Sequence, residues 1–233
     1  MATNRDTVVA VYDKFETADQ VIRALVADGF ERSDIGVAAN NATGAYNNLA
    51  TDKVTDLTTD VSGSEGGGFG AVVGGITGAV VALSAIVIPG IGPIIAAGPL
   101  VALLGGATGA VVGGAAGAVA GGVAASLMHL GIPEEEAQHY VESVRRGNAM
   151  VTVTVTNDED ATTASNVLRR YNPIDVKEMA SQWREKGWSG FDPLSEPYTE
   201  SDLVKEREIS STASGSAPTD DTVRRFPPVP PLT

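Results

Sequence analysis

The 233-residue chain contains no cysteine and few aromatic or basic residues. Without cysteine, no disulfide, thiolate nucleophile or cysteine metal site can form. Lys and Arg number 16 against 29 Asp and Glu, which gives a net charge of −13. Nucleic-acid binding needs clustered basic side chains, so we expect no nucleic-acid partner, and the same charge opposes docking to anionic lipid head groups. The polar opening, residues 1–6, is unlike a signal peptide.

Charge is missing altogether from the middle of the chain. Between Glu65 and Glu134 there is no Asp, Glu, Lys or Arg, and His129 is the one titratable side chain. Clustered Pro and Gly divide this run into two arms, 69–88 and 99–127, and favour a hairpin turn between them. The first arm is long enough to cross a hydrocarbon core of about 30 Å, and the longer second arm must tilt, kink or project. The predicted turn residues are Pro89, Gly90, Gly92 and Pro93.

Glycine recurs at every fourth position in both arms. Residues four apart share one helix face, and a row of glycine lets another helix backbone approach closely. The sequence therefore predicts a glycine zipper, with helix packing inside a hairpin, between chains, or both. The predicted helix-packing residues are Gly70, Gly74 and Gly78 in the first arm and Gly105, Gly109, Gly113, Gly117 and Gly121 in the second.

These arms suit lipid better than water. In water each glycine opposes helix formation by about 1 kcal/mol relative to Ala, whereas in lipid the backbone has no other hydrogen-bonding partner than the helix itself. The ten Phe, Val, Ile or Leu residues of the first arm favour insertion by only about 3–6 kcal/mol, so insertion is marginal. Membrane lipid is one predicted partner. The alternatives are a soluble homo-oligomeric scaffold or shell that buries the hairpin, and burial in the protein's own core.

The flanks have the pattern of short strands and amphipathic helices. Without residues 40–147 the order is β-α-β followed by β-α-β, which predicts an α+β fold with a ferredoxin-like split βαβ domain. We expect one antiparallel four-stranded sheet with two helices on one face. Two half-domains that pair between chains are the competing arrangement. The expected strands are 7–13, 35–38, 149–155 and 174–179, and the expected helices start at Thr17, Pro133 and Asp158 or Asp160.

The domain organisation follows from these patterns. The Pro-rich end, 225–231, can form polyproline II and dock on a protein partner. The predicted regions are 1–39, the first βαβ half; 40–65, a flexible connector; 66–130, the glycine-rich helical hairpin; 131–180, a helix plus the second βαβ half; and 181–233, a disordered acidic and Pro-rich tail.

No pattern of an active site is present. His139 lies at helical spacing from Glu135 and Glu142, but without a second ligand cluster we expect a solvated helix face and no metal. Arg145 and Arg146 complement the dipole at the end of the same helix. Neither GxxxxGK[ST] nor GxSxG occurs, so we predict no catalytic residue, no cofactor and no enzymatic activity.

Several runs resemble bacterial general-stress-protein-like families. They are Ile88-Pro-Gly-Ile-Gly-Pro-Ile94, Ala97-Gly-Pro-Leu100, 130–137 and 144–151, and the opening β-α-β unit resembles the domain of heat-induced general stress proteins. The resemblance spans about residues 7–180. It implies stress-linked expression and membrane association, and it carries no known catalytic residues. We therefore expect a stress-response protein at a membrane, with its folded parts in the cytoplasm.

Overall fold

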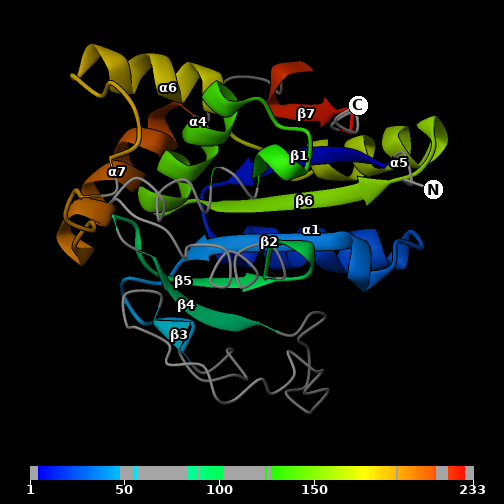
Figure 1. The fold of residues 1–233 in the computed structure, drawn as a ribbon, viewed down its shortest axis with the longest axis horizontal. Helices are drawn as coiled ribbons and strands as arrows, with labels where there is room; N and C mark the ends of the chain where they lie inside the picture. Colours follow the sequence, from blue (N-terminus) through cyan, green and yellow to red (C-terminus); the bar gives the residue numbers. More distant parts are fainter. Residues whose placement is uncertain are drawn as a thin grey trace, which may run out of the picture.

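A computed structural model describes residues 5–47, 55–56, 83–88, 90–101, 124, 127–192, 194–213 and 220–228. The helices and strands form one layered arrangement with the sheet in the middle (Figure 1). They are β1 (Asp6–Tyr12), α1 (Phe15–Ala27), η1 (Arg32–Asp34), β2 (Ile35–Asn40), β3 (Thr55–Asp56), β4 (Ser84–Ile88), β5 (Gly92–Ala97), α4 (Glu134–Arg145), β6 (Ala149–Val155), α5 (Asp158–Arg169), α6 (Val176–Glu185), α7 (Glu200–Ala213), η2 (Asp220–Thr222) and β7 (Val223–Phe226).

One sheet collects strands from the whole length of the chain. Its order is β3-β4-β5-β2-β6-β1-β7, and all neighbours are antiparallel except the short β3–β4 pair. The sheet runs from β7 and β1 at the top of Figure 1 to β3 at the bottom. The central strand β6 lies between β1 and β2, so the two predicted halves pair within one chain. The fold class is α+β.

The central strands are buried on both faces, which explains their composition. Along β1, Val8, Ala10 and Tyr12 contribute to one core, while Val9 and Val11 contribute to the other. Successive side chains point to opposite faces, so a strand covered on both sides has a continuous apolar run instead of an alternating one. Helices must therefore cover both faces of this sheet.

The first core lies beneath α1 and α5. Both helices place their apolar side chains on it, including Val21, Leu25, Val167 and Leu168. The Asn157 side chain accepts a hydrogen bond from the Asp160 backbone N–H, so Asn157 caps α5 in place of the predicted Asp158 or Asp160. Two helices on one face of the sheet were predicted, and α1 and α5 confirm that part of the prediction.

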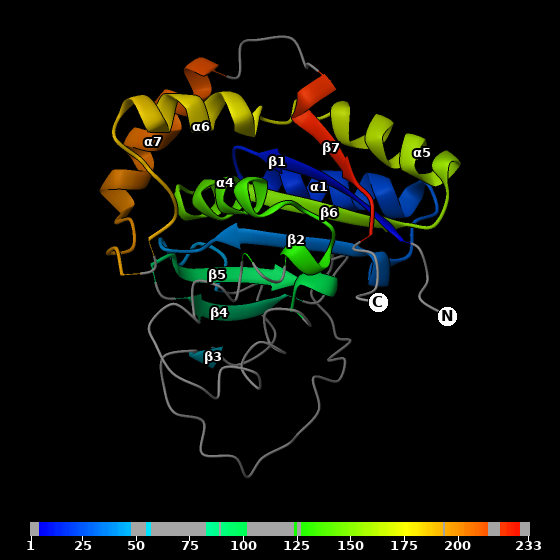
Figure 2. The same cartoon turned by 45° about the horizontal axis from the view of Figure 1, so that its top comes forward.

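The second core lies beneath α4 and α6. It contains Tyr140, Val141 and Val144 of α4, with Met179 and Trp183 of α6. Beyond the left ends of β6 and β2 in both views lies α7 (Figures 1 and 2). Leu203 of α7 is buried there at 1% exposure, although the helix is polar overall.

The prediction of a final strand at 174–179 is wrong, since α6 begins at Val176. Asp175 accepts a hydrogen bond from the Glu178 backbone N–H and so caps the helix. Val176, Met179, Ala180 and Trp183 then follow at helical spacing on the buried face. The strand beside β1 is supplied instead by β7, whose residues 223–226 pair with 7–10.

The helical hairpin predicted across 69–127 is wrong for the end of its first arm and for its turn, whereas the described residues 99–101, 124 and 127 are helical, as predicted for the second arm. Residues 84–88 and 92–97 form two antiparallel strands of the sheet, with Ile86 opposite Ile94. Three β-branched residues close β4, and Gly90 and Gly92 adopt the left-handed φ angles of a tight turn, 76° and 93°. The third alternative for this region, burial in the protein's own core, describes the isoleucines of the hairpin, Ile86, Ile88, Ile91, Ile94 and Ile95.

The predicted disordered tail, 181–233, is also wrong for its described part. It contains the end of α6, all of α7 and β7. The predicted connector, 40–65, contains a hydrogen-bonded turn at 41–47 and the two-residue strand β3.

Candidate functional site

The eight predicted helix-packing glycines lie outside the described residues, as does Pro89 of the predicted turn. Gly90, Gly92 and Pro93 are described: Gly90 lies in the turn between β4 and β5, and Gly92 and Pro93 begin β5, in place of the predicted helix–helix turn. The Ile91 backbone N–H donates to the Ile88 carbonyl over 3.1 Å, and the Asn41 backbone N–H donates to the Pro93 carbonyl over 2.8 Å. The turn is therefore fixed to β2 and lies at one end of the sheet.

A buried group of charged residues lies beside that turn. The last turn of α4 contributes Glu142, Arg145 and Arg146, and the C-terminal region contributes Tyr198 and Glu206; we call these five residues the arginine cluster. Their side chains interact through ion pairs and cation–π contacts. The exposed side-chain fractions are 0% for Glu142, 12% for Arg145, 10% for Arg146 and 14% for Glu206.

Arg145 connects three separate parts of the chain. Its Nε donates to the Gly90 carbonyl over 2.7 Å, one terminal nitrogen contacts Glu142 at 3.3 Å, and the other donates to the Glu196 carbonyl over 2.9 Å. Its guanidinium also lies 4.5 Å from the centre of the Tyr198 ring. Every guanidinium nitrogen thus has a protein acceptor, so this side chain ties the turn to the C-terminal region and is not arranged to bind an anion.

Arg146 makes a second tie between α4 and the C-terminal region. Its Nε donates to Glu142 over 2.6 Å, and a terminal nitrogen donates to Glu206 of α7 over 3.0 Å. The guanidinium lies 4.8 Å from the Trp183 ring centre and 5.4 Å from that of Tyr198. Charge-assisted hydrogen bonds and cation–π contacts are strongest where water is excluded, as it is here.

Glu142 is at the centre of the cluster, and it is unusual because its carboxylate is fully buried. Its Oε1 accepts from both arginines, while its buried Oε2 has no hydrogen-bond partner among the described residues. Burial raises the pKa of the Glu142 carboxyl above its ordinary value, and the guanidinium groups of Arg146 and Arg145 oppose that rise. A buried carboxylate depends on such partners, because an unpaired charge in this position is strongly destabilising.

His139 does not lie on a solvated helix face as predicted. It is 6% exposed, its Nε2 lies 2.8 Å from a terminal nitrogen of Arg184, and its ring lies 5.6 Å from that of Trp188. An arginine donates to that nitrogen only when it carries no proton. Burial lowers the pKa of His139, and Arg184 lowers it further. Within the described residues no group of three acidic or histidine side chains could hold a metal ion.

A small apolar cavity of about 20 Å³ lies under the β4–β5 turn. Ile88, Ile91 and Ile94 of the hairpin line it, together with Leu100 and Leu127, which flank the second glycine-rich segment in sequence. Tyr140, Val141 and Val144 of α4 complete the wall. This space holds no polar side-chain group apart from the Tyr140 hydroxyl, so it serves apolar packing.

The sequence contains a local signal for one part of the arginine cluster, the ion pairs within α4. Glu142 precedes Arg145 and Arg146 by three and four residues, the spacing at which helical side chains meet. The two arginines were assigned to the helix dipole alone. Their partners at 90, 183, 196, 198 and 206 are remote in sequence, so no local pattern could have placed them.

No family model, no curated protein and no solved structure matches the chain. Its function therefore has to be inferred from its own residues.

Proposed function

We propose that this protein is a non-enzymatic stress-response protein that associates with a membrane through its glycine-rich segments and self-assembles. The observation that carries the proposal is the charge-free run 66–133, in which glycine recurs at every fourth position over 66–78 and over 105–121, on either side of the β4–β5 hairpin. Small residues at helical spacing are the contact residues of helices that pack in lipid. The stress-response part rests on the resemblance of 88–100 and 130–151 to general stress proteins.

We further propose that the folded part is a ferredoxin-like split βαβ domain. The order β2-β6-β1-β7 with antiparallel neighbours supports this, as do α1 and α5 packed on one face. In that topology two β-α-β units interleave so that the third strand lies between the first two. The strands β3, β4 and β5 extend the sheet beyond β2, and α4 and α6 cover its second face.

The observed β-hairpin changes how the membrane would be reached. Strand β4 takes up residues 84–88, the end of the predicted first arm, and the remainder is too short for a hydrocarbon core of about 30 Å. The segments 57–82 and 102–123 each start and end beside strands or helices of one folded unit. A path that crosses a bilayer and returns needs roughly 40 residues, more than either segment has. We therefore propose shallow insertion from one side.

Among the described helices, none combines the length and the apolar composition that a membrane crossing requires.

The test is flotation of the full chain with lipid vesicles. Because the net charge is −13, attraction to anionic head groups is unfavourable, and insertion has to be driven by apolar contact. We expect the chain to float with phosphatidylcholine vesicles at least as well as with vesicles that contain phosphatidylserine. Binding to the anionic vesicles alone would contradict insertion of the charge-free segments.

A matched pair of variants locates the contact. Val111→Asp with Val112→Asp places two charges in the second segment, and flotation should be lost. Gln20→Asp with Ser181→Asp adds the same charge at exposed positions on α1 and α6, and flotation should persist. If wild-type protein remains unbound but sediments as a large oligomer that the first pair disrupts, the soluble scaffold is the correct function.

A further inference from the structure

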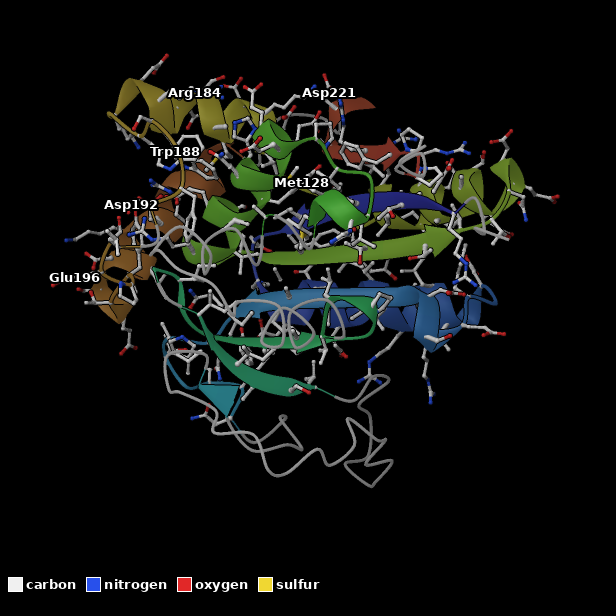
Figure 3. The ribbon with its side chains drawn as sticks, in the orientation of Figure 1. Met128, Arg184, Trp188, Asp192, Glu196 and Asp221 are labelled. Atoms are coloured by element: carbon white, nitrogen blue, oxygen red, sulfur yellow. The ribbon has the colours of Figure 1, made fainter. Side chains whose placement is uncertain are left out.

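One exposed segment passes over the end of the sheet where the β4–β5 turn lies. Figure 3 shows Trp188, Asp192 and Glu196 in succession down the left end of the molecule. The chain then enters α7, whose first turn is capped by Thr199. The Asp202 carboxylate accepts a hydrogen bond from the Thr199 hydroxyl over 2.6 Å. We call residues 194–206 the strap.

The strap contacts the turn both directly and through Arg145. A Cβ atom placed on Gly92 would lie 3.0 Å from the Pro197 side chain, so glycine there permits close approach of the strap. Arg145 donates to the Gly90 carbonyl on the turn and to the Glu196 carbonyl on the strap. The same guanidinium therefore holds both sides of this contact.

The strap is attached mainly by polar contacts. Leu203 is its one large side chain that is fully buried, whereas Leu194 and Val204 are 76% and 50% exposed. Besides the Glu196 carbonyl, its polar contacts include Tyr198, on which Arg145 and Arg146 stack, and Glu206, which pairs with Arg146. A segment with few buried apolar contacts opens at lower free energy than the core strands do.

Apolar residues lie directly beneath this attachment. Ile91, at the tip of the turn, is 1% exposed, and Ile88 and Ile94 flank it in the apolar cavity. Leu100 and Leu127 line the same cavity, so its opening would uncover the residues that lead into and out of the second glycine-rich segment. Loss of the strap would thus create an apolar surface continuous with the charge-free run.

From this geometry we infer that the strap is an autoinhibitory contact. While bound, it holds the β4–β5 turn against α4 and keeps the apolar residues around Ile91 covered. When it detaches, the turn loosens and the surface that leads into the glycine-rich segment becomes available to lipid. The opening step stands on the described contacts alone, and only its link to lipid rests on the proposed function.

The test is hydrogen exchange of the full chain, followed by flotation with phosphatidylcholine vesicles. Tyr198→Ala combined with Glu206→Gln removes the Tyr198 ring and the Glu206 charge, the two strap side chains that contact Arg145 and Arg146, and leaves α4 intact. The Arg145 bond to the Glu196 carbonyl is then the polar contact that remains. We expect the amides of Gly90, Ile91 and Gly92 to exchange about tenfold faster, because a hydrogen bond to a charged group is lost. Leu194→Ala with Val204→Ala, at exposed strap positions, should change neither measurement.

Tyr198→Ala alone serves as a milder variant, and far-UV circular dichroism checks that the sheet persists in each protein. Faster exchange at the turn together with greater flotation supports the inference. Unchanged exchange at the turn, despite faster exchange at 196–206, overturns it. Faster exchange with no flotation of any protein supports the strap and overturns the proposed membrane function instead.

Discussion

The central strands and the C-terminal region are both ordered, but for different physical reasons. Strands β1 and β6 are held by their own apolar residues, such as Val8, Val9 and Val153, each 0% exposed. Strand β7 adds only Val223 and Phe226 to the cores, and its two arginines pair with Glu136, Asp6 and Asp158, which are remote in sequence. Order in the first region is encoded locally, and order in the second depends on residues elsewhere in the chain.

The largest expected effect on stability comes from Gly98, which follows β5 and packs against β2 within the sheet. Gly98 has a φ of 66°, and a Cβ there would overlap the Ile35 carbonyl of β2. Backbone cannot move aside within a sheet, so Gly98→Ala should lower the free energy of unfolding by about 3–5 kcal/mol. Urea denaturation followed by far-UV circular dichroism measures this. A loss below about 1 kcal/mol would show that β2 and β5 are not packed as described.

The buried carboxylate should come next. Glu142→Gln removes the charge that both α4 arginines share, while Glu206 still pairs with Arg146. We expect a loss of about 2–4 kcal/mol in urea unfolding, because breaking a buried ion pair leaves charge uncompensated. The control Glu200→Gln alters an exposed carboxylate at the start of α7. Equal stability of the two variants would contradict a tightly coupled cluster.

Gly131, which packs against the C-terminal region, should give a smaller loss of stability when it is replaced. Gly131 has a φ of 85°, and a Cβ there would overlap the Pro227 carbonyl just after β7. Pro227 lies just beyond the last paired residue of β7, so it can shift without breaking a strand pair. Gly131→Ala should therefore cost only about 1–2 kcal/mol, mostly from backbone strain. Hydrogen exchange should show faster opening at 223–226 and no change at 149–155. A loss as large as that of Gly98→Ala would remove the contrast between the regions.

The weakest stability effect should be pH-dependent and should come from His139. Because burial and Arg184 lower its pKa in the folded protein, the unfolded chain binds the proton first. The stability that the neutral His139 contributes is complete above the ordinary histidine pKa of about 6.5, and it is lost as the pH falls from there through the lowered pKa of the folded protein. The urea midpoint of wild type should therefore fall relative to that of His139→Gln between pH 7 and pH 5. A constant difference would contradict a neutral buried imidazole.

The glycine zipper should not affect the stability of the folded domain. Gly113→Leu should weaken self-association, because a large side chain separates helices that pack through glycine. Val112→Leu changes the neighbouring position and should have little effect if that residue faces lipid. Crosslinking and detergent gels compare the two variants. Identical behaviour would leave the region as an apolar segment without specific packing.

This contrast also explains which elements could be predicted from the sequence. The strands at 6–12 and 149–155 and the helices α1, α4 and α5 were predicted, since β-branched runs and helical spacing are local signals. Strand β4 was misassigned because a short apolar run inside a long charge-free segment fits a helix and a strand equally well. The Gly90 and Gly92 pair was correctly interpreted as a turn, but not as one between strands.

The arginine cluster and β7 could not have been predicted in this way. Arg224 and Arg225 resemble solvent-exposed tail residues, and apart from Asp221 the acidic partners given for them lie more than sixty residues away. The strap could not be predicted for the same reason, since the partners of Tyr198 and Glu206 are Arg145 and Arg146 at the end of α4, about fifty residues or more away in sequence.

The position of β6 between β1 and β2 has a consequence for the order of synthesis. The first β-α-β unit is complete at Asn40, yet its two strands cannot share a sheet until residue 155 has been made. At about 5–20 residues per second, that interval is roughly 6–25 s. The whole charge-free run emerges from the ribosome during this time, before the sheet that borders it can close. A nascent chain with these apolar segments exposed can be captured by a membrane or a chaperone while translation continues.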